Sequence, residues 1–446
     1  MQPGGARRFP PVMQRTKFTK SARPCVARWS FSLQAMTIDA IPMEFIVSTE
    51  TYYGLPPNVE FCRRCVISNQ RPSSTVEFGS DKNEKKSTIT FKEGICSACT
   101  FSLEKDANID WKEREDRLRE LLCHFKRNDG RYDVVVPGSG GKDSAYTAHV
   151  LKYKYGMNPL TVTWAPHLYT DIGWRNFSNW MHVGGLDNIL YTPNGKLHRL
   201  LTRFAFLNLL HPFQPFIIGQ RIIGPTLAAR YGVELVMYGE NQAEYGNNIN
   251  DNQRPTMDAA FYSTGETLEM KFGGMTMCDI IATYGFGLGD FAPYIPPTRD
   301  MLETAGVEVH YLGYYLKWDP QECYYYAVEH TGFQANPERT EGTYSKYSSI
   351  DDRIDPFHYY TTLVKFGLGR ASYDAAQEIR NGKITREEGI NLVRKFDQEF
   401  PAKYFREFLE YIDITEEEFR ETVDRFRSPH LWRKVDGEWQ LKHAVS

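Results

Sequence analysis

Short apolar runs alternate with longer amphipathic stretches in the middle of this chain. Four largely apolar runs predict strands, at residues 133–137, 160–164, 188–192 and 234–238, and the first of these is expected to be buried. Helical patterns lie between them, at 144–155, 197–210 and 219–231. Strands and helices that alternate at this spacing indicate right-handed βαβ units around a parallel sheet. We therefore predict an α/β fold with a doubly wound parallel sheet, whose ligands bind beyond the carboxyl ends of the strands.

The regions on either side of this pattern differ from it. Residues 111–127 form a charged helical stretch, and the chain after Tyr311 is first rich in aromatic residues and then helical. Thr415 and Glu418 have the spacing of a helix capping box. The predicted parts are a basic, disordered tail at 1–43, a cysteine-containing module with a helix at 44–128, the sheet domain at 129–310, and a mainly helical C-terminal region at 311–446.

The composition is that of an ordinary folded protein. Of the 446 residues, 41% are hydrophobic and 24% are charged, which excludes a wholly disordered chain. Polar residues and prolines interrupt the longest apolar stretch, residues 204–218. We therefore predict no membrane span and a cytoplasmic protein.

The formal net charge of −3 is unevenly distributed. Residues 1–38 carry seven Lys or Arg and no acidic residue, which leaves −10 on the remainder of the chain. A folded body this acidic argues against binding to a nucleic acid backbone. The basic tail is either a transit peptide or a segment ahead of a natural start at Met36 or Met43. The second interpretation is favoured because no amphipathic helix is evident there.

Four of the eight cysteines form two CxxC pairs. Cys62 and Cys65 make the first pair, and Cys96 and Cys99 make the second. Four thiolates on two short turns provide the closed tetrahedral ligand set of structural zinc. An iron–sulfur cluster or a redox dithiol would use the same residues, and spacing alone does not separate zinc from iron. We predict structural zinc, since paired CxxC motifs are typical of metal binding in a reducing compartment.

The sequence Ser139-Gly-Gly-Lys-Asp-Ser144 lies between the first predicted strand and its helix. It lacks the spacing of a Walker A loop but matches SGGxDS, the signature of the PP-loop ATP pyrophosphatases. Gly140 and Gly141 let backbone N–H groups approach a phosphate closely, and the start of the helix adds its positive end. The motif therefore predicts an ATP-binding loop, with a tight surface turn as the alternative.

Each polar side chain of this loop has an expected part in the chemistry of ATP. Ser139 and Ser144 can donate hydroxyl hydrogen bonds to phosphate oxygens, and Lys142 supplies positive charge. Asp143 would be repelled by phosphate unless a divalent cation lies between them, which indicates Mg²⁺. We therefore expect Lys142 and Asp143 to be catalytic residues as well as ATP ligands.

Further motifs extend over most of the chain. They are Cys62-Arg-Arg-Cys65-Val66, Gly239-Glu-Asn241 with Glu244-Tyr-Gly246, Leu312-Gly-Tyr-Tyr-Leu-Lys-Trp-Asp-Pro320, Glu341-Gly-Thr-Tyr344, Phe366-Gly-Leu-Gly-Arg-Ala371 and Arg427-Ser-Pro-His430. In these segments and the loop, the chain resembles the N-acetyl sugar amidotransferases of bacterial surface-polysaccharide biosynthesis. The resemblance spans about residues 60–442. The loop is shared with many enzymes, whereas residues 312–320 and 366–371 are far more particular to this family.

The resemblance implies an ATP-dependent conversion of an acetamido group on a nucleotide-activated sugar into an acetamidino group. AMP is transferred to the amide oxygen, and a nitrogen nucleophile then displaces it, so the protein works by positioning and charge neutralisation. The resemblance also implies ammonia from a separate glutaminase subunit. The chain itself has no cysteine in the context of a glutaminase nucleophile.

Two other functions compete with this one. Several PP-loop enzymes with CxxC pairs transfer sulfur to tRNA, but a tRNA thiolase needs a basic surface and a catalytic cysteine near the loop. The acidic body argues against it, and so does the lack of a CxxC pair at or after the loop, with Cys123 as a weak exception. A non-catalytic nucleotide-binding partner is disfavoured because Asp143 is intact.

Five more residues are candidates for the site. Glu240 and Asn241 follow the fourth predicted strand, where they are catalytic candidates or parts of an ordinary strand-end turn. Lys317 and Trp318 are candidate substrate contacts, and Trp318 either stacks on a sugar or base or belongs to the core. Arg370 either clamps a pyrophosphate or a sugar carboxylate, or caps a helix.

Overall fold

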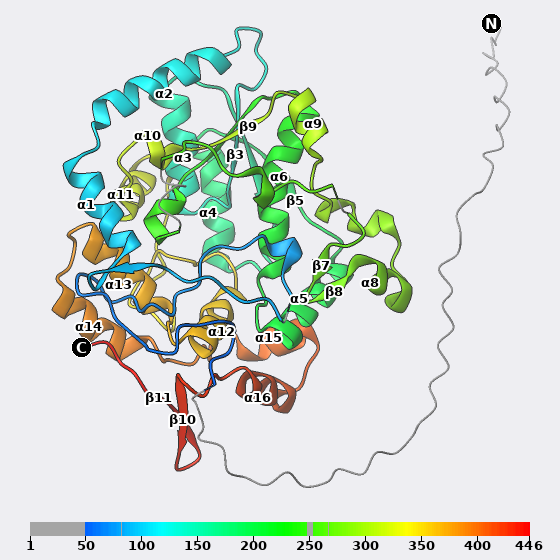
Figure 1. Cartoon of the computed structure of the whole chain (residues 1–446). Coiled ribbons are helices and arrows are strands. Elements are labelled where there is room, and N and C mark those ends of the chain that lie inside the picture. The colour runs from blue at the N-terminus through cyan, green and yellow to red at the C-terminus, as the bar shows by residue number, and fades with distance from the viewer. Residues whose placement is uncertain (1–49, 82, 248–252, 266) are drawn as a thin grey trace, which may run out of the picture. The chain divides into compact units, whose positions relative to one another are not determined.

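A five-stranded parallel sheet forms the centre of the computed structural model, which describes residues 50–81, 83–247, 253–265 and 267–446 (Figure 1). The predicted basic tail at 1–43 lies outside the described residues. The strands are β3 (Val134–Pro137), β4 (Pro159–Trp164), β5 (Asp187–Tyr191), β6 (Leu235–Tyr238) and β9 (Glu308–Tyr311), in the spatial order β5-β4-β3-β6-β9. The chain winds outward from β3 in both directions, which confirms the doubly wound α/β fold.

The predicted strands match the observed ones within about one residue at each end. All four residues of β3 are buried, as expected for a central strand covered on both faces. Val134 lies beside Pro159 of β4 and beside Leu235 of β6. The sequence pattern did not reveal β9, because only four residues form it and two of them, Glu308 and His310, are polar.

Helices cover both faces of the sheet. On one face, α3 (Lys142–Tyr153) packs on β3, β4 and β6, with α4 (Asp171–His182) nearby and α11 (Pro320–Thr331) against α3. On the other face lies α6 (Gln214–Tyr231), which α5 (Gly195–Leu209) contacts. A Cβ at Gly224 would lie 2.6 Å from the Pro137 ring, so glycine permits the close approach of α6 to β3. Within the described residues, no helix is both long and apolar enough to cross a bilayer.

Two smaller regions frame the sheet domain. The cysteine-containing region holds the short hairpin of β1 (Phe91–Lys92) and β2 (Ile95–Cys96), followed by α1 (Ser97–Ala107) and α2 (Trp111–Phe125). A second short hairpin, β7 (Lys271–Phe272) with β8 (Met275–Thr276), precedes α8 (Met277–Tyr284) and α9 (Arg299–Thr304) in the segment between β6 and β9.

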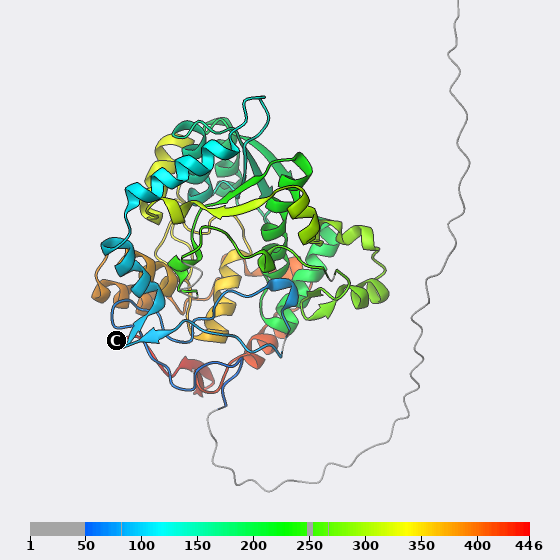
Figure 2. The same ribbon diagram turned by 45° about the horizontal axis from the view of Figure 1, so that its top comes forward.

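The C-terminal region is mainly helical, as predicted. Its elements are α10 (Leu312–Tyr315), α11, α12 (Asp355–Phe366), α13 (Arg370–Arg380), α14 (Arg386–Phe396), α15 (Phe405–Ile412) and α16 (Glu416–Arg425). The predicted capping box of Thr415 and Glu418 is present. The hairpin of β10 (Trp432–Val435) and β11 (Glu438–Leu441) was not predicted. In Figure 2, α12 and α13 lie on the same side of the sheet as the segment before α1.

Candidate functional site

The loop 139–144 follows the carboxyl end of β3, where the winding direction changes between β3 and β6. The first turn of α3 begins at Lys142, so its backbone N–H groups lack helical acceptors there. Gly140 has a φ of +82°, and a Cβ at this position would lie 2.9 Å from the Cα of Phe177 in α4. Only glycine fits both conditions. The resulting turn offers N–H groups and the positive end of a helix to an anion.

The polar side chains of the loop divide into two groups. Residues 139–143 line a cavity. Ser144 does not, because its hydroxyl donates a hydrogen bond of 3.1 Å to the carbonyl of Gly141 and so holds the start of α3. Ser139 makes a hydrogen bond with Asp351, whose pKa is raised by burial and lowered again in part by this bond.

Lys142 and Asp143 form an ion pair at the cavity wall, with 2.5 Å between Nζ and Oδ2. Burial lowers the pKa of Lys142, but the charges of Asp143 and Glu240 outweigh this effect and raise it above its ordinary value. The lysine is therefore cationic. The second carboxylate oxygen of Asp143 is buried and has no hydrogen-bond partner. A free carboxylate oxygen beside a phosphate-binding turn fits the predicted Mg²⁺ site.

Glu240 and Asn241 follow β6, as the sequence predicted, but only Glu240 lines the cavity. Burial and the nearby charge of Asp143 raise the pKa of Glu240 to about 7. This carboxyl group can therefore take up and release a proton near neutral pH. Asn241 is buried, and its side-chain oxygen accepts a hydrogen bond of 3.2 Å from the N–H of Ala243. With this hydrogen bond, Asn241 caps the short 3-10 helix Gln242–Tyr245.

The cavity has a volume of about 610 Å³, which is in the range of small-molecule sites. Most of its lining comes from four stretches of the chain, which are residues 67–86, the loop 139–143, residues 210–221 and residues 333–380. Further lining residues lie at 166–176 and 240–247. The cysteine-containing region, the sheet domain and the C-terminal region therefore all contribute to the wall of this cavity.

The C-terminal wall carries Arg370 at the start of α13, so this predicted substrate contact does lie at the cavity. Its Nε is 3.0 Å from the carboxylate of Asp374, and its guanidinium lies 4.2 Å from the ring centre of Tyr359. Burial raises the pKa of the neighbouring Asp355 to about 8, although Arg370 opposes this. Arg370 is thus held in place by a carboxylate and an aromatic ring.

Lys317 and Trp318 do not line the cavity. The ammonium group of Lys317 is half exposed and pairs with Asp106 at 2.8 Å. Trp318 is 1% exposed and packs edge-on against Tyr146, and a Cβ at Gly239 would lie 2.8 Å from its ring. The structure therefore places Trp318 in the core, which was the alternative to a substrate contact.

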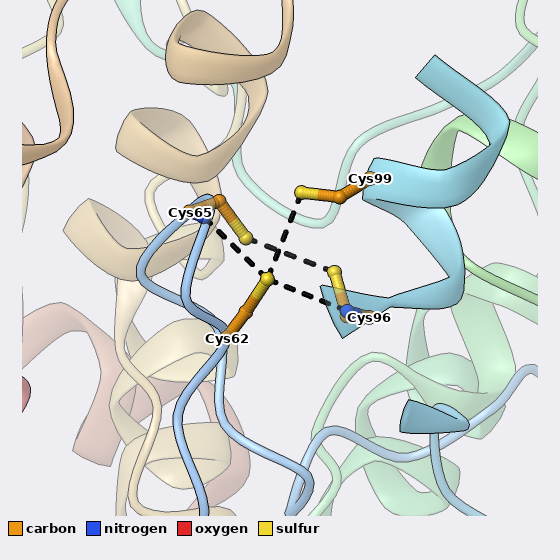
Figure 3. Close-up of side chains that lie close together, drawn as sticks. All are labelled: Cys62, Cys65, Cys96 and Cys99. Carbon is orange, nitrogen blue, oxygen red and sulfur yellow. Dashed lines mark hydrogen bonds between the residues drawn. The ribbon is translucent and has the colours of Figure 1, made fainter. Parts of the chain in front are cut away.

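The four paired cysteines meet in one fully buried cluster (Figure 3). The sulfur atoms of Cys62 and Cys99 are 3.8 Å apart, and those of Cys65 and Cys96 are 3.7 Å apart. A tetrahedron with Zn–S bonds of about 2.3 Å has edges of about 3.8 Å, so the cluster has the size of a Cys₄ metal site. The backbone N–H groups of Cys65 and Cys96 point to the sulfur of Cys62, at 3.5 and 3.4 Å.

The cysteine cluster joins the first hundred residues to the C-terminal helices. Val66 and Ile67, which follow the first pair, are fully buried together with Ala375 and Ala376 of α13. Arg386 of α14 donates hydrogen bonds to the carbonyls of Cys65, at 3.1 Å, and of Cys62, at 3.3 Å. A metal at this position would therefore stabilise the packing of α13 and α14.

A buried ion pair connects α1, which carries Cys99, to the cavity-lining segment after β6. Lys105 donates to Glu244 at 2.8 Å, and both side chains are 2% exposed. The same ammonium donates to the carbonyl of Trp318 at 2.7 Å and to Asn381 at 3.2 Å. The sequence gives no sign of this pair, because Lys105 lies outside the motifs and 139 positions before Glu244.

Comparison with known proteins gives a match in the C-terminal region. Residues 341–445 match the family described as the C-terminal domain of WbpG-like lipopolysaccharide biosynthesis proteins. This part of the chain is WbpG-like. The resemblance to surface-polysaccharide biosynthesis proteins that the sequence motifs predicted is thereby confirmed. Arg370 and Asp374, which lie at the cavity, belong to the WbpG-like domain.

Two further proteins are similar to parts of this chain. Over 68 residues, 15% of this chain, the sequence is 35% identical to the uncharacterized protein MJ1599 of Methanocaldococcus jannaschii, and the match spans 24% of that protein's length. The NMN synthetase from Francisella tularensis is a structural neighbour at 13% identity, with 70% of this chain and 97% of that chain covered and a TM-score of 0.27.

Several polar residues at the cavity were not predicted. Arg71, Arg221, Lys365 and Asp355 all line it. No motif marks them, because they come from separate elements that meet only in the fold. The one available signal is that Lys365 directly precedes Phe366-Gly-Leu-Gly-Arg-Ala371, a segment of the family resemblance.

Proposed function

We propose that the chain is an ATP-dependent amidotransferase of the PP-loop type, which converts an acetamido group of a nucleotide-activated sugar into an acetamidino group in bacterial surface-polysaccharide biosynthesis. The shared cavity carries this proposal. The loop 139–143 and Arg370 of the WbpG-like domain line the same space. A nucleotide-binding turn and a domain matched by lipopolysaccharide biosynthesis proteins therefore meet at one site.

The proposed reaction has two steps. First, the amide oxygen of the sugar attacks the α-phosphorus of ATP, and pyrophosphate leaves. Ammonia then attacks the activated carbon, the new C–N bond forms, and the C–O bond to AMP breaks. The nitrogen loses protons as the acetamidino group forms, and AMP leaves with the original amide oxygen.

Three residues have assigned parts in these steps. Glu240 accepts a proton from the attacking nitrogen, because its pKa of about 7 suits a base at neutral pH. Lys142 offsets negative charge on the phosphates. Asp143 would hold Mg²⁺ with its unpartnered oxygen, and the cation would neutralise charge on the phosphate oxygens.

A metal ion and a partner subunit complete the proposal. Zinc bound by Cys62, Cys65, Cys96 and Cys99 has a structural role, because the four sulfur atoms form a closed, buried ligand set. Ammonia comes from a separate glutaminase subunit, as the sequence resemblance implies. The test therefore supplies ammonium salts in place of that subunit.

The test measures AMP and pyrophosphate released from Mg·ATP and ammonium in the presence of nucleotide-activated acetamido sugars, or of bulk tRNA. Exchange of the carbonyl oxygen for NH lowers the sugar mass by about one unit, which mass spectrometry resolves. We expect AMP only with an acetamido sugar, together with the mass change. Reactions without sugar and without ammonium are the controls.

The remaining outcomes separate the alternatives. AMP that forms only with tRNA would overturn the sugar reaction and favour the thiolase. Release of ADP and phosphate in place of AMP and pyrophosphate would overturn the PP-loop chemistry altogether.

A further inference from the structure

A second group of cations lies at the cavity, apart from the loop 139–144. It consists of Arg221 on α6, Lys365 on α12, and Lys86 and His211 beside them. Lys86 pairs with Glu84 at 3.1 Å, and His211 lies 3.3 Å from Glu77. Arg221 and Lys365 have no ion pair with any carboxylate in the part of the chain that the structure describes. Two basic side chains therefore remain without an ionic partner.

The contacts of these two cations leave several donors free. Lys365 is 8% exposed, and its ammonium group donates one hydrogen bond, of 2.8 Å, to the carbonyl of Leu209. Arg221 donates to the carbonyl of Thr75 at 3.3 Å, and its guanidinium lies 4.8 Å from the ring centre of Phe261. An ammonium has three donors and a guanidinium has five, so most of them have no protein acceptor.

Shared neighbours place the two cations around one end of the cavity. Burial raises the pKa of Glu77, but His211, Arg221 and Lys86 outweigh it and lower the pKa to about 2. Glu77 and Lys86 also act on the pKa of Lys365. The charges that act on Lys142, by contrast, are those of Asp143 and Glu240. Lys142 pairs with Asp143, whereas Arg221 and Lys365 donate to the carbonyls of Thr75 and Leu209, so the two cation groups have separate contacts at the cavity.

We propose that Arg221 and Lys365 form a second phosphate-binding subsite, which holds the diphosphate of the nucleotide-activated sugar while ATP occupies the loop 139–144. The assignment of that ligand rests on the proposed function. Its two negative charges match the two unpaired cations. A buried ammonium without a counter-ion is costly, and phosphate oxygens would supply both charge and acceptors. Burial, assisted by Lys86, lowers the pKa of Lys365 to about 7, which is the direction expected for a cation that lacks an anion.

The test blocks the first subsite and probes the second. The protein is saturated with Mg²⁺ and α,β-methylene-ATP, which cannot be cleaved between the α and β phosphates, and is then titrated with pyrophosphate in a calorimeter. We expect one further pyrophosphate to bind. Lys365→Met and Arg221→Gln should each weaken this binding at least about tenfold and leave the affinity for the ATP analogue within about twofold.

Lys317→Met is the matched control, since this lysine is half exposed and pairs with Asp106 outside the cavity. Lys365→Met should also keep its melting temperature, because replacement of a buried charge by an apolar chain of similar size is tolerated. The melting temperature therefore separates loss of the subsite from loss of the fold.

Three results would overturn the subsite. They are no pyrophosphate binding to the analogue-saturated protein, unchanged pyrophosphate binding in both variants, or a loss of affinity for the analogue itself, which would assign the cations to ATP. The outcome is independent of turnover. If pyrophosphate binds as expected but no acetamido sugar yields AMP, the phosphate subsite stands and the proposed reaction fails.

Discussion

The cysteine cluster and the loop 139–144 are both small constellations of reactive side chains, but they are built in opposite ways. The four cysteines are fully buried and packed against apolar residues of α13. The loop borders a cavity, the side chain of Asp143 is 35% exposed, and one of its oxygens has no partner. The buried cysteines can hold a metal that stabilises the fold. The partly exposed carboxylate of Asp143, by contrast, is free to contact a molecule bound in the cavity.

The two regions are nevertheless connected. α1 starts at the second cysteine pair, and its Lys105 holds Glu244 in the segment that also carries Glu240. Loss of the cysteine cluster should therefore damage both the fold and the site, whereas loss of the Asp143 charge should damage mainly the chemistry.

Removal of the metal should have the largest effect. Structural zinc contributes about 10–16 kcal/mol to small zinc modules, so a chelator should abolish the cooperative melting of the region around α1, α13 and α14. Circular dichroism with metal analysis measures this. Cys123→Ser, at an exposed cysteine outside the cluster, is the control and should change nothing. A metal-free protein with an unchanged melting temperature would contradict the structural role.

Lys105→Met should be the next most severe change. Removal of one partner leaves Glu244 buried and unpaired, which costs about 3–5 kcal/mol. Denaturant unfolding gives this value. Lys317→Met removes an exposed pair with Asp106 and should cost at most about 1 kcal/mol. The double variant Lys105→Met with Glu244→Leu should recover most of the loss, and its failure to do so would point to another role for Lys105.

Asp143→Asn should separate chemistry from stability. The substitution keeps the shape but removes the charge that would hold the cation, so AMP formation should fall about a thousandfold. The melting temperature should fall by only a few degrees, because Asp143 faces the cavity and Glu240 still offsets the charge of Lys142. Asp116→Asn, on the exposed face of α2, is the matched control. Activity retained in Asp143→Asn would remove this residue from the site.

Glu240→Gln should change the stability in a way that depends on pH. The pKa of Glu240 is raised to about 7 in the folded protein, so its contribution to stability is present below about pH 4.5 and is lost as the pH rises through 7. The variant should therefore melt higher than the wild type at pH 8 and alike at pH 4. Its AMP formation should lose the dependence on a group that titrates near pH 7. Equal melting curves at both pH values would contradict the shifted pKa.

The central fold was predictable because local patterns determine it. Residues 134–137 are apolar throughout, which marks a strand covered on both faces, and the glycine pair at 140 and 141 marks the turn that follows. β9 escaped prediction because His310 and Glu308 break its apolar pattern, and the pairing with β6 that completes the strand joins residues about 70 positions apart.

The site was predictable only where one motif supplies it. The loop 139–143, Glu240 and Arg370 were found at the cavity as expected, since each follows a strand or stands in a glycine-rich segment. Arg221 has no such context and Lys365 only borders a glycine-rich segment, because an unpaired cation can be recognised only when its neighbours are known. Trp318 shows the converse: a tryptophan beside charged residues has the same sequence appearance in a core as in a binding site.

The packing of α13 and α14 against the cysteine cluster has a consequence for the order of synthesis. Cys99 leaves the ribosome about 280 residues before Ala375, which at 5–20 residues per second is a delay of roughly 15–55 s. During that interval the thiols lack the apolar cover that the finished protein gives them. Nascent chains should therefore be most vulnerable to oxidation and to misplaced metal ions before the last quarter of the protein has been translated.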